Sequence, residues 1–319
     1  MSRRIVFLDA ATVGNDVSLS PLERHGSLSV FPATSPLETA ERIAEAEVVV
    51  TNKVPLGAER LAEAPSLRLV AIAATGSDHV DLAAAKKLGI AVCCVRGYST
   101  AGVAQHAIAL LLNLATHQHL FSRETQLWPA SPIFTRLAHP VVELEGKTLG
   151  IAGAGAIGSR TGEIAVALGM RVQCLARPGS ANAAHPEWPR VDCHTFFQSS
   201  DAVSLHCPLT AGTAKMIGPR SLDLMPSHAF LINTSRGALI DEEALAEALR
   251  HHRIAGAALD VLSTEPPPPG HPLLDPSIPN LLITPHSAWI ARETRQRLID
   301  EIAANLETFL AGRSRNRLV

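Results

Sequence analysis

The stretch "TLGIAGAGAIGSR", residues 148–160, joins an apolar run to the spacing G-x-G-x-x-G at Gly153, Gly155 and Gly158. Between a strand and a helix, this spacing predicts a dinucleotide site. The first glycine permits a tight turn, the second lets the backbone approach a pyrophosphate, and the third lets the helix pack closely on the sheet. The helix N-terminus offers free N–H groups to the phosphates. A glycine-rich turn without a ligand is the alternative interpretation.

The next apolar run, "RVQCLA" at residues 171–176, bears on which dinucleotide binds. NAD sites usually carry Asp or Glu near this point, where the acid bonds the ribose 2′-hydroxyl. Here Ala176 stands 18 positions after Gly158 (176 − 158), and Arg177 follows it. Alanine does not repel a 2′-phosphate, and an arginine can pair with one. The sequence therefore favours NADP(H). NAD(H) stays possible, with Arg177 stacked on the adenine.

Short apolar runs alternate with helical patterns along the whole chain. The first series contains "RIVFLD", "EVVVTN", "LVAIAA" and "IAVCCV", and a second series begins at "KTLGIAG" and ends at "LLITP". Runs without strict alternation are typical of parallel strands buried on both faces. Two such series predict an α/β fold with two doubly wound parallel-sheet domains. The pattern also predicts helices at Pro36–Ala46, at Ser99–His119 and over residues 292–312.

Composition excludes several classes of protein. The net charge of −2 gives no electrostatic basis for binding nucleic acid or a membrane surface. No stretch approaches the roughly 18 apolar residues of a spanning helix, and no secretory leader is evident. The five cysteines contain no CxxC pair, which favours reduced thiols and a cytoplasmic protein. The histidines show no metal-ligand spacing, so no metal is expected.

Three later stretches carry side chains suited to chemistry: "LINTSRGALIDEEAL", "ALDVLSTEP" and "ITPHSAW". Each follows a predicted strand of the second domain. In an open α/β sheet, side chains just beyond the carboxyl ends of strands line the ligand crevice. Arg236, Glu265 and His286 stand at these places. Reduction of a 2-keto acid requires three such groups: a guanidinium to bind the anionic substrate (Arg236), a carboxylate to hold the base (Glu265) and an acid/base (His286).

These motifs, together with "TNKVPL", "AATGSDHVDLAAA", "GYSTAGVAQHAIALLL" and "LHCPLT", occur in order along the chain. Over essentially its full length the chain resembles the D-isomer-specific 2-hydroxyacid dehydrogenases. Within them it is most similar to the glycerate dehydrogenase, hydroxypyruvate reductase and glyoxylate reductase branch. The resemblance implies a flavodoxin-like substrate-binding domain at residues 1–98 and 289–319. A Rossmann cofactor domain would be inserted at residues 99–288.

The resemblance also implies roles for single residues. His286 would be the acid/base, Glu265 would orient its imidazole, and Arg236 would bind the substrate carboxylate and keto oxygen. Asp260 would meet the nicotinamide carboxamide, although a strand-end hydrogen-bond anchor is the alternative. On the substrate side, the N–H groups of Thr75 and Gly76 would bind the substrate carboxylate. Lys53 is a further candidate for substrate binding, and its side chain points either to the crevice or to water. The implied cofactor contacts also include Val103, Gly153, Gly155, Ala156, Ile157, Gly158, Arg177, Cys207, Pro208, Thr213, Thr234, Ser235, His286 and Ala288.

The expected activity is NAD(P)H-dependent reduction of hydroxypyruvate or glyoxylate to the D-2-hydroxy acid by a cytoplasmic homodimer. In the family, the region of residues 123–140 belongs to the dimer interface. Trp128 and Phe134 would then face a neighbour, unless both rings fill the surface of their own subunit. Two alternatives remain open. One is a dehydrogenase of phosphoglycerate, phosphite or formate on the same scaffold; the other is a dinucleotide-sensing corepressor-type binding module.

Overall fold

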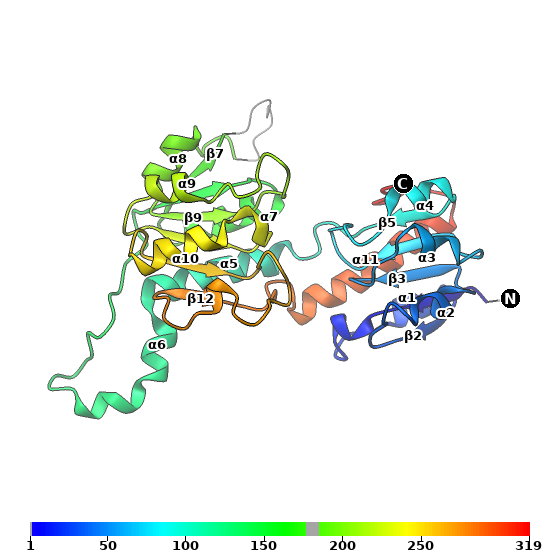
Figure 1. Cartoon of the computed structure of the whole chain (residues 1–319), viewed down its shortest axis with the longest axis horizontal. Helices are drawn as coiled ribbons and strands as arrows, with labels where there is room; N and C mark the ends of the chain where they lie inside the picture. Colours follow the sequence, from blue (N-terminus) through cyan, green and yellow to red (C-terminus); the bar gives the residue numbers. More distant parts are fainter. Residues whose placement is uncertain (1, 177–184) are drawn as a thin grey trace. The chain divides into compact units, whose positions relative to one another are not determined.

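The computed structural model describes residues 2–176 and 185–319. The chain divides into two compact units, Met1–Ser99 with Trp289–Val319, and Thr100–Ala288 (Figure 1). The boundary expected from the sequence, after residue 98, lies one residue earlier. Within the described residues, no helix combines the length and the apolar character needed to cross a membrane.

The first unit is built on a five-stranded sheet in the order β2-β1-β3-β4-β5, and every neighbouring pair is parallel. This is the flavodoxin-like strand order. The strands are β1 (Arg4–Phe7), β2 (Ser27–Val30), β3 (Val48–Thr51), β4 (Leu69–Ile72) and β5 (Ala91–Cys93), and the helices are α1 (Ser20–Glu23), α2 (Thr39–Ile43), α3 (Ala58–Ala62), α4 (Leu82–Lys87) and α11 (Arg292–Leu310).

The C-terminal helix α11 completes this unit although it follows the whole second unit in sequence. Its apolar face, which includes Leu298, Ile302 and Leu306, lies in the same core cluster as Ile5 and Phe7 of β1. These side chains are fully buried. Burying such a face against the sheet supplies the main driving force for helix docking.

The second unit has a seven-stranded sheet in the order β12-β11-β10-β9-β6-β7-β8, again with every described pair parallel. The strand order reverses at β6, which pairs with β9 on one side and β7 on the other. The strands are β6 (Thr148–Ala152), β7 (Arg171–Leu175), β8 (Arg190–Val191), β9 (Ala202–Leu205), β10 (Phe230–Asn233), β11 (Gly256–Leu259) and β12 (Leu281–Ile283), and the helices are α5 (Thr100–Thr116), α6 (Gln118–Arg123), α7 (Ala156–Ala167), α8 (Cys193–Ser199), α9 (Pro219–Leu224) and α10 (Glu242–Arg250).

Helices cover both faces of this sheet (Figure 1). On one face α5 and α7 pack against Leu149 and Ile151 of β6. On the other face α8, α9 and α10 pack against Val203 and Leu205 of β9. The strands are thus apolar on both sides, as the runs without alternation predicted. The predicted fold class, two doubly wound parallel-sheet domains, is confirmed.

Several predicted element bounds are wrong in detail. The helix predicted to run to His119 ends at Thr116, because His117 adopts a left-handed φ of 50° before α6 begins. The helix predicted over Pro36–Ala46 is shorter, spanning Thr39–Ile43. The edge strands β2 and β8 were not predicted from sequence.

Candidate active site at the strand ends of the second unit

Parallel pairing places the predicted site residues at one edge of the second sheet. Ala152 of β6 pairs with Leu205 of β9, which pairs with Asn233 of β10. Asn233 in turn pairs with Leu259 of β11, and Leu259 pairs with Ile283 of β12. The segments that follow these last residues therefore emerge side by side. They carry the glycine turn, Arg236, Asp260, Glu265 and His286.

The glycine turn has the backbone that a dinucleotide requires. Gly153 has a φ of 102°, and a Cβ there would overlap the backbone of His206 and Cys207. At Gly158 a Cβ would overlap the carbonyl oxygen of Gly153. A Cβ on Gly155, by contrast, would meet nothing within 4 Å, and no side chain caps the N-terminus of α7 there. The turn therefore leaves open backbone at the helix N-terminus, which fits a pyrophosphate.

A second feature also fits a bound dinucleotide. The hydroxyl oxygen of Thr234, just after β10, is buried and has no hydrogen-bond partner within the described residues. Buried polar atoms are normally paired, so an unpaired one at a strand end is suited to a ligand group. The other predicted cofactor contacts lie on the same unit: Val103 on α5, Ala156 and Ile157 at the start of α7, Cys207, Pro208 and Thr213 after β9, Ser235 after β10, and Ala288 after β12.

The end of β7 bears on the choice between NADP and NAD. Ala176 is exposed directly after the strand, and its N–H donates to the carbonyl oxygen of Val191 at 2.8 Å. No carboxylate stands at this position. Arg177 lies outside the described residues, so its predicted contact with a 2′-phosphate stays a prediction.

His286 and Glu265 form a close pair. Nδ1 of His286 lies 2.6 Å from Oε2 of Glu265, and both side chains are about one third exposed. The other carboxylate oxygen of Glu265 accepts the N–H of Leu262 at 2.9 Å. The carboxylate is therefore fixed by its own loop while it orients the imidazole. A histidine held at Nδ1 keeps Nε2 available for proton transfer.

Arg236 follows β10 in an extended conformation, and its side chain is exposed. Its Nη1 donates to the carbonyl oxygen of Ser235 at 2.8 Å. The next residue, Gly237, is buried, and a Cβ there would overlap the backbone of Leu262 and Ser263. Glycine thus lets the loop that carries Arg236 lie directly against the loop that carries Glu265.

Asp260 is 1% exposed and anchors the segment around His286. Oδ1 accepts the N–H of Ser287 at 2.8 Å, and Oδ2 accepts the N–H of Ala288 at 2.9 Å. Burial alone would raise the pKa of Asp260, but hydrogen bonds from His106, Thr284 and these N–H groups outweigh it and lower the pKa. These contacts make Asp260 a hydrogen-bond anchor at the end of a strand, which was the alternative interpretation of this residue. Its contact with the nicotinamide carboxamide stays a prediction.

The predicted substrate contacts Lys53, Thr75 and Gly76 belong to the first unit, beyond the ends of β3 and β4. The hydroxyl of Thr75 donates to the carbonyl oxygen of Val95 at 2.7 Å, and the N–H of Lys53 donates to Asp9 at 2.6 Å. Asp9 is buried, and burial raises its pKa although hydrogen bonds from the 52–54 backbone lower it. The contribution of Lys53, Thr75 and Gly76 to substrate binding stays a prediction.

Sequence reasoning missed three residues that shape these segments: Asp9, His106 and Thr284. Asp9 stands just after the first strand, in "FLDA". A polar residue beyond the carboxyl end of a parallel strand is itself a signal of a functional position. Thr284 stands two residues before His286 in "ITPHSAW", and this closeness was its only signal. His106 sits in a very apolar helix, where nothing in the sequence marks its partners.

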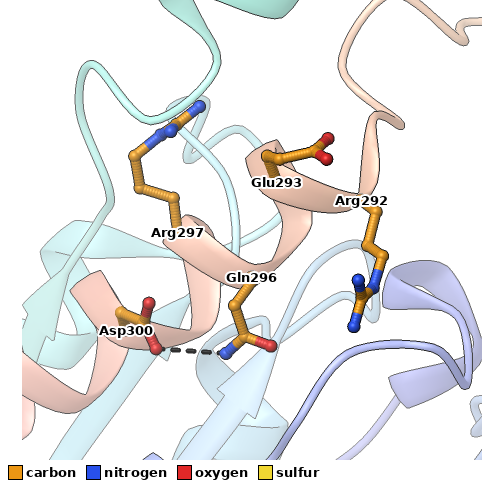
Figure 2. Close-up of a pocket in the computed structure, with 5 residues that line it drawn as sticks. All are labelled: Arg292, Glu293, Gln296, Arg297 and Asp300. Carbon is orange, nitrogen blue, oxygen red and sulfur yellow. Dashed lines mark hydrogen bonds between the residues drawn. The ribbon is translucent and has the colours of Figure 1, made fainter.

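A surface pocket of about 390 Å³ lies on the first turns of α11 (Figure 2). Arg292 and Arg297 point into different directions there, and each Nε already donates to a carbonyl oxygen, of Asp16 and Tyr98 respectively. The pocket contains none of the predicted site residues. Among the described residues, no group of three or more His, Cys, Asp or Glu side chains is arranged to hold a metal ion.

Comparison with known proteins identifies the class. Residues 108–288 match the family model described as D-isomer specific 2-hydroxyacid dehydrogenase, NAD binding domain. The chain therefore belongs to the D-isomer specific 2-hydroxyacid dehydrogenase family, and the resemblance noted in the sequence is confirmed. It is a dehydrogenase with a nicotinamide-dinucleotide-binding domain.

Particular relatives are similar over nearly the whole chain. A glycerate dehydrogenase of Methylorubrum extorquens is 39% identical over 319 residues, which is 99% of each chain. A hydroxypyruvate reductase of Blautia hydrogenotrophica is 38% identical and covers 97% of each chain. The solved structure of an acyclic imino acid reductase in complex with NADPH and D-arginine has a TM-score of 0.87 at 28% identity, covering 99% of this chain and 100% of that one.

The glycine turn offers a test that separates folding from cofactor binding. Gly158→Ala should lower the free energy of unfolding by about 1–3 kcal/mol, because its Cβ overlaps the Gly153 carbonyl. Gly155→Ala should cost less than about 1 kcal/mol, since its Cβ meets no protein atom. It should nevertheless weaken dinucleotide binding at least tenfold, because the Cβ fills the space for the pyrophosphate. Urea unfolding and fluorescence titration measure the two effects. Unchanged affinity in Gly155→Ala would contradict the assignment.

Proposed function

We propose that this chain reduces a small 2-keto acid, hydroxypyruvate or glyoxylate, to the D-2-hydroxy acid with NAD(P)H, using His286 as acid/base. The observation that carries the proposal is the 2.6 Å pair between His286 and Glu265 at the sheet edge that also carries the glycine turn. The names of the relatives, glycerate dehydrogenase and hydroxypyruvate reductase, support this substrate class.

In this mechanism His286 moves the proton. When bound, the nicotinamide supplies the hydride to the carbonyl carbon. Nδ1 of His286 donates to Glu265, and Nε2 gives its proton to the keto oxygen, so that C=O becomes CH–OH. The hydrogen bond from Nδ1 to Glu265 fixes the ring for this transfer. In the oxidative direction Nε2 accepts the same proton.

Arg236 binds the substrate anion. Its guanidinium presents a rigid fork of donors that matches a carboxylate and an adjacent keto oxygen. The bond from Nη1 to the Ser235 carbonyl oxygen restricts how the side chain can swing. Lysine at this position would supply charge without the fork.

NADP(H) is the favoured cofactor in this proposal, and NAD(H) is the second choice. The support is the absence of an acid at Ala176 together with Arg177 in the sequence. We also propose that the enzyme works in the cytoplasm, where its five free cysteines would stay reduced.

A homodimer is the proposed assembly, formed through the segment of residues 118–141, called the arm below. The residues that flank the arm are joined, because the N–H of Val142 donates to the carbonyl oxygen of Ala115 at 2.8 Å. Figure 1 shows the arm extending away from the second sheet. Phe134 is 89% exposed and Leu137 is 83% exposed. Large apolar side chains gathered on one exposed segment favour a protein interface. A second copy of the chain is the partner that we propose.

The acid/base assignment is tested with His286→Ala. The substitution should lower kcat for hydroxypyruvate by about 10³-fold, since it removes the proton donor, and leave dinucleotide affinity nearly unchanged. His251→Ala is a matched control, because His251 pairs with Glu247 at 2.8 Å on an exposed helix end. Initial rates at 340 nm measure both. Near-normal turnover in His286→Ala would overturn the mechanism.

The cofactor preference is tested with Arg177→Ala. Losing one charge-assisted contact with the 2′-phosphate should weaken NADPH binding by about 2 kcal/mol, or roughly 30-fold in the dissociation constant, with little effect on NADH binding. Arg171→Ala, at the opposite end of β7, is the control. Dissociation constants for both dinucleotides decide the question. Equal losses for the two would show that Arg177 does not recognise the phosphate.

The assembly is tested with the double substitution Phe134→Asp and Leu137→Asp. Placing two carboxylates on the arm should convert a dimer to a monomer, because buried charges without partners oppose association. Leu37→Asp is the control, since Leu37 is 91% exposed on the first unit. Light scattering after size exclusion gives the mass. A monomeric parent protein, or a dimer that survives the double substitution, would contradict this interface.

A further inference from the structure

We propose that His106 is a positioning residue for the acid/base, acting through Thr284 and Asp260 to hold the backbone of His286. This inference rests on the proposed role of His286. His106 lies on α5, and its side chain does not take part in the pair between His286 and Glu265. It acts on the segment that carries the catalytic imidazole.

The backbone of His286 is in a conformation that needs support. Its φ is 53°, in the left-handed region that residues with a Cβ rarely adopt. Its N–H donates to the carbonyl oxygen of Asp260 at 2.8 Å and to that of Thr284 at 2.9 Å. The left-handed turn therefore depends on how firmly residues 260 and 284 are held.

Asp260 holds the residues after the turn as well. Its carboxylate accepts the N–H groups of Ser287 and Ala288, at 2.8 Å and 2.9 Å. Together with its carbonyl oxygen, this one residue bonds three consecutive N–H groups, those of residues 286, 287 and 288. A shift of the Asp260 carboxylate would move the backbone on which the imidazole is mounted.

The hydroxyl of Thr284 links this carboxylate to His106. This O–H group donates to Oδ1 of Asp260 at 2.5 Å, and its oxygen lies 3.0 Å from Nε2 of His106. A hydroxyl can donate only one hydrogen bond, and Thr284 donates its one to the Asp260 carboxylate. The Thr284 oxygen can then only accept from His106, so Nε2 of His106 carries the proton. The same nitrogen lies 3.4 Å from Oδ1 of Asp260.

His106 is itself firmly placed. Its neighbours on α5, Ala107, Leu110 and Leu111, are buried in the core cluster that contains β6 and β10. The His106 side chain is 23% exposed. The helix therefore delivers a fixed N–H donor to a carboxylate that would otherwise depend on the short loop after β12 for its orientation. Rigid support of this kind is what accurate placement of an acid/base requires.

The test compares His106→Leu with His106→Gln in the full-length enzyme. Leucine keeps an apolar bulk and removes the donor, so kcat for hydroxypyruvate should fall about tenfold, with less than twofold change in the dinucleotide dissociation constant. Glutamine restores an N–H donor and should recover most of kcat. Gln105→Leu, at the exposed neighbouring position of α5, is the control and should leave kcat unchanged.

A double-mutant cycle tests the route. Thr284→Val removes the linking hydroxyl and should lower kcat about as much as His106→Leu, while the combination should cost little more than either alone. Additive losses would show that the two side chains act separately and would overturn the proposal. The test stays decisive if His106→Leu does not fold, because Thr284→Val alone should still lower kcat about tenfold, and full kcat in that variant would overturn the proposal.

The outcomes separate this inference from the proposed function. If His286→Ala is inactive while His106→Leu keeps full kcat, the positioning role is wrong and the acid/base role stands. If His286→Ala stays active, the proposed function fails and the positioning role with it. Equal losses of kcat in His106→Leu and His106→Gln would show that the ring packs rather than donates, which would also overturn the proposal.

Discussion

The carboxylate of Asp260 is buried just after β11 and accepts hydrogen bonds from two backbone N–H groups and from the hydroxyls of Thr284 and Ser287. A buried charge is tolerated only where such donors surround it. Here the donors belong to residues on both sides of His286. Burial of this charge therefore favours the chain path observed around the proposed acid/base, because a path that moved residues 287 and 288 away would remove two of the hydrogen bonds that stabilise the carboxylate.

The parallel sheet is what brings these groups together. Residues far apart in sequence, from Gly153 to His286, follow strands whose last residues are paired across the sheet. A strand reversal at β6 leaves the glycine turn between the segments after β7 and β9. Ligands of open α/β sheets bind at such points. The fold alone therefore predicts where a dinucleotide binds, whereas the choice between NAD and NADP depends on side chains.

The sequence predicted the buried parallel strands and the glycine turn well, because both depend on local patterns. It missed β2 and β8 because neither strand forms a buried apolar run: three of the four residues in β2 are exposed, and β8 has only two residues, neither of them fully buried. It extended α5 beyond Thr116, since an apolar pattern does not reveal the left-handed His117. Asp260 and His106 lie 154 positions apart (260 − 106), and only the folded chain shows that they meet.

Arg236, Glu265 and His286 are not placed independently of one another. Gly237 lets the loop after β10 lie against the backbone of residues 262 and 263. The N–H of Leu262 bonds Glu265, and Glu265 bonds His286. A substitution at Gly237 would therefore displace Arg236 and Glu265, the proposed anion-binding and orienting residues, together. This coupling explains why the buried Gly237, beside the exposed Arg236, belongs with the proposed site: it lets the loop that carries Arg236 lie against the loop that carries Glu265.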